Sequence, residues 1–300
     1  MREGPPSATE GGAPAVPIRG STTVVGVIGW PVRYSLSPQI HNAGFAALGL
    51  DWAYVPLPVP PGKLRAAVEG LVAMGFAGAN VTIPHKSGAA ELCDELSEEA
   101  ARVAAVNTLA VGEEGRVRGH DTDVEGFDRF LRGEAGCDPA GRTALVFGAG
   151  GAARACALAL ARAGLARLLV AVREPARAEP LVRALGDLPT EVEVMRFGAA
   201  EGAELGEGGI VVNATPVGAA GERLPLPRLG PGTVVVDLLY RPDPTPLLEA
   251  ARAAGAEAHG GLGMLLHQAA CSFELWTGRA APLEAMRAAA ERALGAARGR

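Results

Sequence analysis

Short runs of consecutive apolar residues alternate with amphipathic segments along most of the chain, and this alternation predicts an α/β fold. The run Thr23–Ile28 is apolar throughout, as strands buried on both faces of a parallel sheet are. A helix is expected next, with Ser37 as its N-cap and Pro38 as its first residue. Further strands are expected at Trp52–Leu57 and Ala79–Val81, with a helix between them. These elements predict a mainly parallel sheet in the N-terminal part of the protein.

A second series of strands and helices is expected after the break Gly133–Gly141, where we place a domain boundary. The strand Thr143–Phe147 meets the pattern Gly148-x-Gly150-x-x-Ala153, and a helix follows it. In that context Gly148 allows a tight turn, Gly150 lets a pyrophosphate approach the backbone, and the helix N-terminus favours the phosphate charge. The pattern therefore predicts a Rossmann-type dinucleotide-binding domain.

The residues after the next strand bear on which dinucleotide binds. NAD-binding proteins usually carry Asp or Glu at this strand end for the ribose hydroxyls, whereas this chain has Arg173. Arg173 and Arg177 suit a 2′-phosphate, while Glu174 between them opposes that anion. The sequence predicts NADP as the cofactor and leaves NAD possible.

The composition restricts the partners and the location that we expect. The formal net charge of −5 argues against nucleic acid as the main partner. We recognise no signal peptide and no apolar run long enough to span a bilayer, so we expect a cytoplasmic protein that binds no membrane. Residues 1–21 are rich in Pro, Gly, Ala and Ser and are expected to form a disordered tail. The cysteines are widely spaced without a CxxC pair, which indicates core thiols rather than disulfides or a metal site: Cys93, Cys137, Cys156 and Cys271.

One lysine stands out as a candidate for chemistry. The stretch Gly78–Lys86 predicts a strand, a short loop and then a helix that runs from Lys86 to about Leu96. A cation at a helix N-terminus is mildly unfavourable, and the chain uses lysine only at Lys63 and Lys86. Unlike arginine, lysine can lose its proton when burial or a neighbouring charge lowers its pKa. An exposed loop lysine remains the alternative interpretation.

Other polar residues lie where small ligands bind in α/β proteins. Ser35 and Ser37 follow a strand and precede a helix. The alternative interpretation is that Ser37 is only a cap and Ser35 only a loop residue. Asn107 lies in the apolar strand Val106–Val111 and needs a partner if it is buried. Asp123 precedes a helix expected from Val124, where an acidic side chain also compensates the helix dipole.

Eight segments, in order, resemble the shikimate dehydrogenase family from Val24 to about Gly278. They are VIGWPVRYSLSPQIHN, GANVTIPHK, AVNTL, HDTDVEGF, GAGGAA, NATPVG, DLLYRPDPTPLL and GLGMLLHQAACSFELWTG. The resemblance implies reversible, NADPH-dependent reduction of 3-dehydroshikimate to shikimate in aromatic amino acid biosynthesis. It also implies a substrate domain of residues 22–123, completed by C-terminal helices in 262–300, and an NADP-binding domain of residues 124–261, with the active site between them.

The resemblance assigns roles to individual residues. Lys86 and Asp123 match the catalytic pair, and we expect a protonated Lys86 to donate the proton while Asp123 orients it. The matching substrate contacts are Ser35, Ser37, Thr82, Asn107, Asp123, Tyr240 and Gln268. The matching cofactor contacts are Gly148, Ala149, Gly150, Gly151, Ala152, Ala153, Arg173, Arg177, Thr215 and Gly261.

The chain departs from the family pattern at four positions, which keeps alternatives open. Tyr34 stands where the family usually has His, and Asp121 where it has Asn; Val172 and Glu174 replace the Asn and Ser/Thr beside Arg173. A quinate or aminoshikimate dehydrogenase that uses NADP or NAD is one alternative. A catalytically silent NADP-sensing module is a more remote one, and a folate-pathway dehydrogenase lacks support from the serine and glutamine motifs. The protein is expected to be a monomer or a homodimer.

Overall fold

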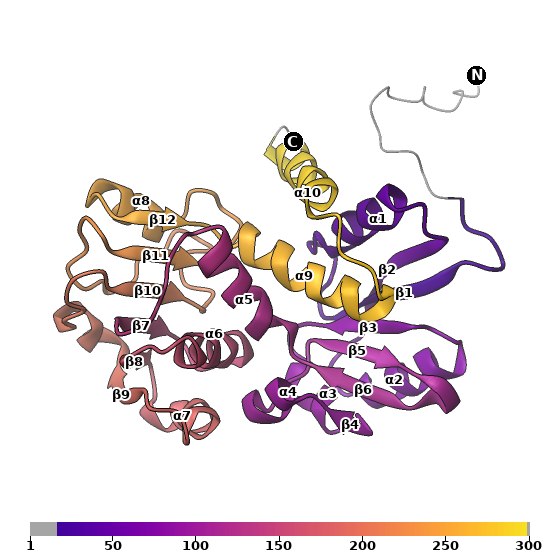
Figure 1. Cartoon of the computed structure of the whole chain (residues 1–300), viewed down its shortest axis with the longest axis horizontal. Coiled ribbons are helices and arrows are strands. Elements are labelled where there is room, and N and C mark those ends of the chain that lie inside the picture. Colours follow the sequence, from indigo (N-terminus) through magenta and orange to yellow (C-terminus); the bar gives the residue numbers. More distant parts are fainter. Residues whose placement is uncertain (1–16, 299–300) are drawn as a thin grey trace.

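The computed structural model describes residues 17–298, and within them the chain builds two six-stranded sheets with helices packed around each (Figure 1). Residues 1–16, most of the predicted tail, lie outside the described residues. The described part makes contacts from its start, because Ser21 and Thr22 each donate a hydrogen bond of 2.6 Å to the carboxylate of Asp51. This N-terminal segment is thereby attached to the turn before the second strand.

The first sheet has the strand order β2-β1-β3-β5-β6-β4. Its strands are β1 (Thr23–Gly29), β2 (Trp52–Pro58), β3 (Gly78–Val81), β4 (Glu95–Leu96), β5 (Thr108–Val111) and β6 (Val117–His120). Its helices are α1 (Ser37–Ala47), α2 (Leu64–Ala73), α3 (Lys86–Ala90) and α4 (Glu98–Val103). Two helices from the end of the chain, α9 (Leu262–Thr277) and α10 (Leu283–Arg298), pack with this half of the molecule.

The first sheet is mixed, although the parallel prediction holds for its first three strands. β1 pairs in parallel with β2 and with β3. β5 runs antiparallel to both β3 and β6. The turn Glu113–Gly115 between β5 and β6 is too short for the crossover that parallel neighbours require.

The second sheet is entirely parallel, with the order β12-β11-β10-β7-β8-β9. Its strands are β7 (Thr143–Phe147), β8 (Arg167–Val172), β9 (Glu191–Arg196), β10 (Ile210–Asn213), β11 (Val234–Asp237) and β12 (Glu257–His259). Its helices are α6 (Gly151–Arg162), α7 (Glu179–Leu185) and α8 (Pro246–Ala253). The strand order reverses between β7 and β10, which is where doubly wound sheets bind dinucleotides. The predicted Rossmann-type architecture is confirmed.

Several expected helix ends differ from the structure. Ser37 is the first residue of α1 rather than its N-cap, and its backbone N–H donates to Ser35 Oγ at 3.2 Å. The helix expected from Lys86 to about Leu96 stops at Ala90, and the chain then turns into the short strand β4. Helix α5 (Thr122–Gly133) begins two residues earlier than expected, because Asp121 accepts a hydrogen bond from its first turn and caps it.

Helices α5 and α9 pack against each other between the two sheets (Figure 1). Glycine permits their close approach: a Cβ on Gly126 would lie 2.6 Å from the backbone N and Cα of Gln268. A Cβ on Gly263 would likewise lie 2.5 Å from the ring of Phe130. The crossing therefore holds Gln268 at a fixed position relative to the start of α5.

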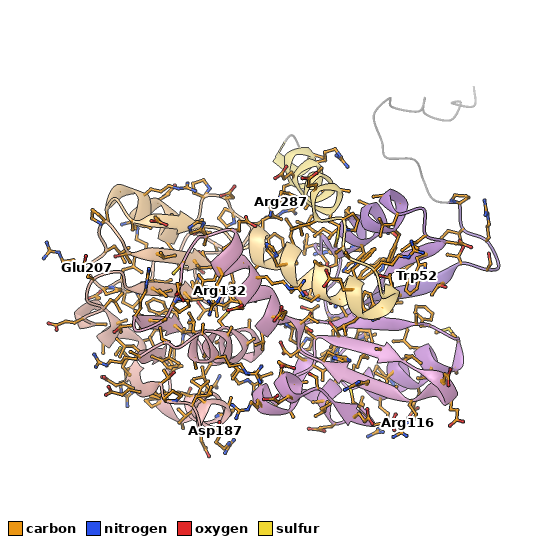
Figure 2. The ribbon with its side chains drawn as sticks, viewed as in Figure 1. Trp52, Arg116, Arg132, Asp187, Glu207 and Arg287 are labelled. Carbon is orange, nitrogen blue, oxygen red and sulfur yellow. The ribbon has the colours of Figure 1, made fainter. Side chains whose placement is uncertain are left out.

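Ion pairs join the two halves on the side away from α9. Asp187, which is labelled in Figure 2, follows α7. It pairs with Arg102 of α4. Arg162 of α6 bonds Glu98 at 2.6 Å and Glu99 at 2.7 Å, both on α4. Among the described residues, no helix is both long and apolar enough to cross a membrane.

Candidate active site

A cleft of about 560 Å³ lies between the carboxyl ends of the first sheet and the glycine-rich loop of the second. All the residues that we expected to act in catalysis or substrate binding line it, although they come from six separate stretches of the chain. They are Ser35, Ser37, Thr82, Lys86, Asn107, Asp123, Tyr240 and Gln268. Four of the predicted cofactor contacts also line it: Gly150, Gly151, Ala152 and Gly261.

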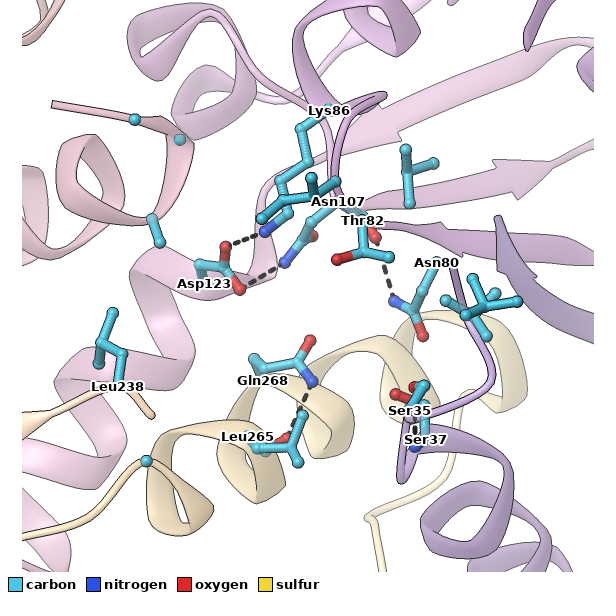
Figure 3. A pocket seen from close by; sticks show the side chains of 18 of the residues that line it. Ser35, Ser37, Asn80, Thr82, Lys86, Asn107, Asp123, Leu238, Leu265 and Gln268 are labelled. Atoms are coloured by element: carbon cyan, nitrogen blue, oxygen red, sulfur yellow. Dashed lines mark hydrogen bonds and ion pairs between the residues drawn. The ribbon is translucent and has the colours of Figure 1, made fainter. Parts of the chain in front are cut away.

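Lys86 and Asp123 form an ion pair in this cleft (Figure 3). Their side chains are 20% and 8% exposed, so the pair is largely removed from water but open to a ligand. The other oxygen of the Asp123 carboxylate accepts a hydrogen bond of 2.8 Å from the Asn107 amide. Both oxygens of Asp123 are thus held, one by each neighbour.

Charge around Lys86 keeps it protonated. Burial alone lowers the pKa of its ammonium group, but the carboxylates of Asp123 and Asp121 outweigh that effect and raise the pKa above its ordinary value. Lys86 is therefore an ammonium at neutral pH. It can stabilise a developing negative charge and donate a proton, whereas it is a poor base by itself.

The Asn107 side chain has a single orientation that its neighbours determine. Its carbonyl oxygen accepts from the Thr122 backbone N–H at 2.8 Å and from the Thr108 hydroxyl at 2.9 Å. The amide nitrogen consequently faces Asp123 (Figure 3). The hydrogen-bond partner that a buried Asn107 needs is thus Asp123, one of the two catalytic candidates.

Sequence reasoning missed a second buried asparagine beneath the site. Asn80 in β3 donates to the hydroxyls of Thr108 and Ser272, each at 2.9 Å, and accepts from the Tyr54 hydroxyl at 2.7 Å. This network ties strands β2, β3 and β5 to helix α9. The argument used for Asn107 applies equally to Asn80, a polar residue inside an apolar strand.

A neighbouring cavity of about 570 Å³ follows the carboxyl ends of β7, β8 and β10 and shares Gly150 with the first. The predicted cofactor contacts that line it are Gly148, Ala149, Arg173, Arg177 and Thr215. Gly148 has a φ of +103°, which favours glycine, and a Cβ on Gly150 would meet no atom within 4 Å. These features fit a dinucleotide whose phosphates approach the loop and the start of α6.

Three of the predicted cofactor residues also have structural roles. Ala153 lines neither cavity and is fully buried in the core of the second sheet. Thr215 is oriented by its hydroxyl, which donates to Asn213 at 2.7 Å. A Cβ on Gly261 would lie 2.1 Å from the Leu238 carbonyl oxygen, so glycine is needed where the chain enters α9.

The arginines expected to hold a 2′-phosphate lie at the far end of this cavity. Arg173 and Arg177 are both exposed, so their guanidinium groups are accessible to a phosphate at the surface. Arg177 Nε lies 3.2 Å from the Glu174 carboxylate, so part of its charge is already compensated. Elsewhere, the four cysteines are free, and no group of His, Cys, Asp or Glu within residues 17–298 could hold a metal ion.

The glycine-rich loop of the Rossmann sheet faces a buried lysine–aspartate pair across a cleft. This arrangement defines a dinucleotide-dependent oxidoreductase of small polar substrates. Comparison with known proteins narrows this class. Residues 27–109 match the family model "Shikimate dehydrogenase substrate binding domain", and residues 261–291 match "Shikimate 5'-dehydrogenase C-terminal domain". The chain belongs to the shikimate dehydrogenase family.

Individual relatives agree with that assignment. A shikimate dehydrogenase (NADP(+)) of Rubrobacter xylanophilus is 52% identical over 277 residues, which are 91% of this chain and 96% of the relative. A shikimate dehydrogenase crystallised with NADP+ superimposes with a TM-score of 0.85 at 34% identity, covering 94% of this chain and 99% of its own. A quinate dehydrogenase of Corynebacterium glutamicum in complex with NAD gives a TM-score of 0.81 at 32% identity, covering 89% and 98%.

Proposed function

We propose that this protein is an NADP-dependent shikimate dehydrogenase that reversibly reduces 3-dehydroshikimate to shikimate. The observation that carries the proposal is the Lys86–Asp123 pair, held by Asn107 in a cleft that opens on the glycine-rich loop. A shikimate dehydrogenase (NADP(+)) that matches this chain over nearly its whole length supports the same substrate and cofactor.

The residues of the cleft have separable tasks in this proposal. The Ser35 and Ser37 hydroxyls, with Tyr240, hold the substrate carboxylate at one end. Thr82, Asn107 and Gln268 read the ring hydroxyls beside the catalytic pair. Gln268 donates one N–H to the Leu265 carbonyl at 2.9 Å, which leaves its oxygen and second N–H for a ligand. An analogue lacking a hydroxyl would leave such groups unpaired and would be rejected.

The chemistry divides between the cofactor and this chain. NADP, when bound, supplies or takes up the hydride. Lys86 stabilises the negative charge that develops on the substrate oxygen during reduction and donates its proton to that oxygen. Asp123 orients the ammonium group and keeps it charged, in agreement with the raised pKa of Lys86. In the opposite direction the pair accepts the hydroxyl proton.

We assign the substrate side to residues 22–123 completed by helices in 262–300, and the NADP side to residues 124–261. In support, one buried cluster joins α9 and α10 to the first sheet through Val25, Phe45, Phe273 and Met286. Another cluster surrounds α6 and the second sheet. Helix α5 contacts both α6 and α9, so it belongs to the junction as much as to the NADP side.

A quinate dehydrogenase that uses NAD is the second candidate. It is favoured by the Glu174–Arg177 pair, which weakens the charge available to a 2′-phosphate, and by the structural similarity to a quinate dehydrogenase in complex with NAD. A catalytically silent NADP-sensing module would not need the buried ion pair that this chain has kept.

Initial rates of oxidation of shikimate and of quinate, each with NADP and with NAD, test these candidates. The proposal predicts the highest kcat/KM for shikimate with NADP. Preference for quinate or for NAD would replace it by the second candidate. Binding of NADPH without oxidation of either acid would favour the sensing module.

A further inference from the structure

Asp121 is a buried carboxyl group two residues before Asp123, and its charge acts on Lys86 of the Lys86–Asp123 pair. The residue is 3% exposed, and its Oδ1 accepts a hydrogen bond of 3.1 Å from the Asp123 backbone N–H. Its Oδ2 is shielded from solvent and has no hydrogen-bond partner among the described residues. An unpaired carboxylate oxygen in such a place is costly, so it indicates a group that exchanges a proton or binds water.

A third cavity, of about 350 Å³, lies beside Asp121, and none of its lining residues lines the cleft in front of the pair. This back pocket is lined by Asp121 and Thr122 and by Leu275, which is 42% exposed. Its other titratable residues are Glu99, His120, Glu125, Arg129, Cys271 and Glu274. Arg129 bonds both Glu125 and Glu274, and Glu99 bonds Arg162, so the permanent charges there are paired.

Local electrostatics make Asp121 ionise near neutrality. Burial, and then the charge of Asp123, raise the pKa of Asp121 to about 7, while Lys86 opposes the rise. Two further titratable groups of α6 interact with it. Arg154 is a buried cation whose pKa is lowered by burial and partly restored by the Asp121 charge. Cys156 is a thiol whose pKa burial and the two carboxylates raise, so it stays neutral.

The reaction needs a path for its proton. Under the proposed function, substrate and dinucleotide occupy the cleft in front of the pair, where Gly151 already approaches Lys86: a Cβ on Gly151 would lie 3.5 Å from Lys86 Cδ. We propose that Asp121 relays the proton of the reaction between the Lys86–Asp123 pair and the back pocket, behind the bound ligands.

This relay rests on the proposed function. In oxidation the substrate carbon gives a hydride to NADP+ and its hydroxyl gives a proton to the Lys86–Asp123 pair. The pair passes that proton to the Asp121 carboxylate, which releases it to water in the back pocket. In reduction every step runs in reverse. Asp121 acts only through the pair and touches no substrate.

The test replaces Asp121 by Asn, which retains the size and the capping oxygen but not the exchangeable proton. Asp128→Asn is the matched control, because Asp128 lies on the same helix, is partly exposed and pairs with Arg132. We expect the wild type and Asp128→Asn to show an ionisation of kcat near pH 7 in shikimate oxidation. Asp121→Asn should lose that ionisation and several-fold of kcat at neutral pH.

A second readout follows the proton itself. In a single turnover with an indicator dye, proton release should keep pace with NADPH formation in the wild type and lag behind it in Asp121→Asn. Equal pH profiles and simultaneous proton release in both proteins would overturn the relay. If Asp121→Asn does not fold, Asp121→Ser, which also caps helices, takes its place in both measurements.

A third readout needs no ligand and separates failure of the relay from failure of the proposed function. Because the folded state holds the Asp121 proton more tightly than the unfolded chain does, the wild type loses stability as the pH rises towards 7. The unfolding midpoint of Asp121→Asn, relative to the wild type, should therefore rise between about pH 4 and 7 and stay level above that range. A constant difference would contradict the relay even if the wild type oxidised no shikimate.

Discussion

The crossing of α5 and α9 makes a sharp prediction for Gly126→Ala. The added Cβ would lie 2.6 Å from the backbone N and Cα of Gln268, and neither atom can turn away as a flexible side chain could. The helices would have to separate by roughly 1 Å, and overpacking of this kind costs about 1–3 kcal/mol. The better helix propensity of alanine offsets about 1 kcal/mol of that cost. Taking the upper value for a backbone clash, we expect a net loss of about 2 kcal/mol.

Gly133→Ala is the matched control, because Gly133 ends the same helix and a Cβ there would meet no atom within 4 Å. That variant should be at least as stable as the wild type. Urea unfolding of the three proteins measures both effects. Since Gly126→Ala also displaces Gln268 from the cleft, its KM for shikimate should rise. Equal unfolding free energies for the two variants would refute the argument from close approach.

Three further predictions concern single side chains. Lys86→Met should lower kcat by at least about a hundredfold with little change in NADPH binding. Steady-state rates measure kcat, and cofactor fluorescence measures NADPH binding. Collapse of substrate affinity with unchanged kcat would argue for a binding role of Lys86 instead. Arg173→Ala should raise the KM for NADP by about tenfold or more and leave the KM for NAD nearly unchanged, because the lost contact is to the 2′-phosphate. Asn80→Ala deprives Tyr54 and Ser272 of a buried partner and should cost about 1–3 kcal/mol in urea unfolding, whereas an unchanged midpoint would mean that the network is not a source of stability.

The parts of the fold that depend on local pattern were predictable. The continuous apolar run of β1 and the glycine pattern after β7 each follow from neighbouring residues, and both lie where expected. The antiparallel direction of β5 was not predictable from local pattern, because it depends on the length of the turn to β6 rather than on the strand's own residues. The early end of α3 also reflects tertiary context, since β4 pairs with β6 across the chain.

The candidate site shows the same division. Lys86 is recognisable because lysine is rare in this chain and because it lies at the start of a helix. The structure pairs it with Asp123, which lies 37 residues further on. Asn80 is recognisable by the same argument as Asn107, but its partners are not predictable, because one of them, Ser272, lies 192 residues away. Asp121 was visible only as a departure from the family pattern. Its burial and its unpaired oxygen follow from how α5, α6 and α9 meet, which no local stretch reveals.

Helix α9 makes the assembly of this protein depend on the order in which it is synthesised. The strands of the first sheet are complete by residue 120, but Phe273 and Gln268 reach the ribosome exit only after the entire second sheet has been made. Until then the nascent chain exposes the apolar side of β1 and α1 that α9 covers, which is a surface that chaperones bind. The substrate half, whose strands are synthesised first, is therefore the last to be completed. A chain interrupted after β12 would keep its nucleotide fold and lack a complete substrate site.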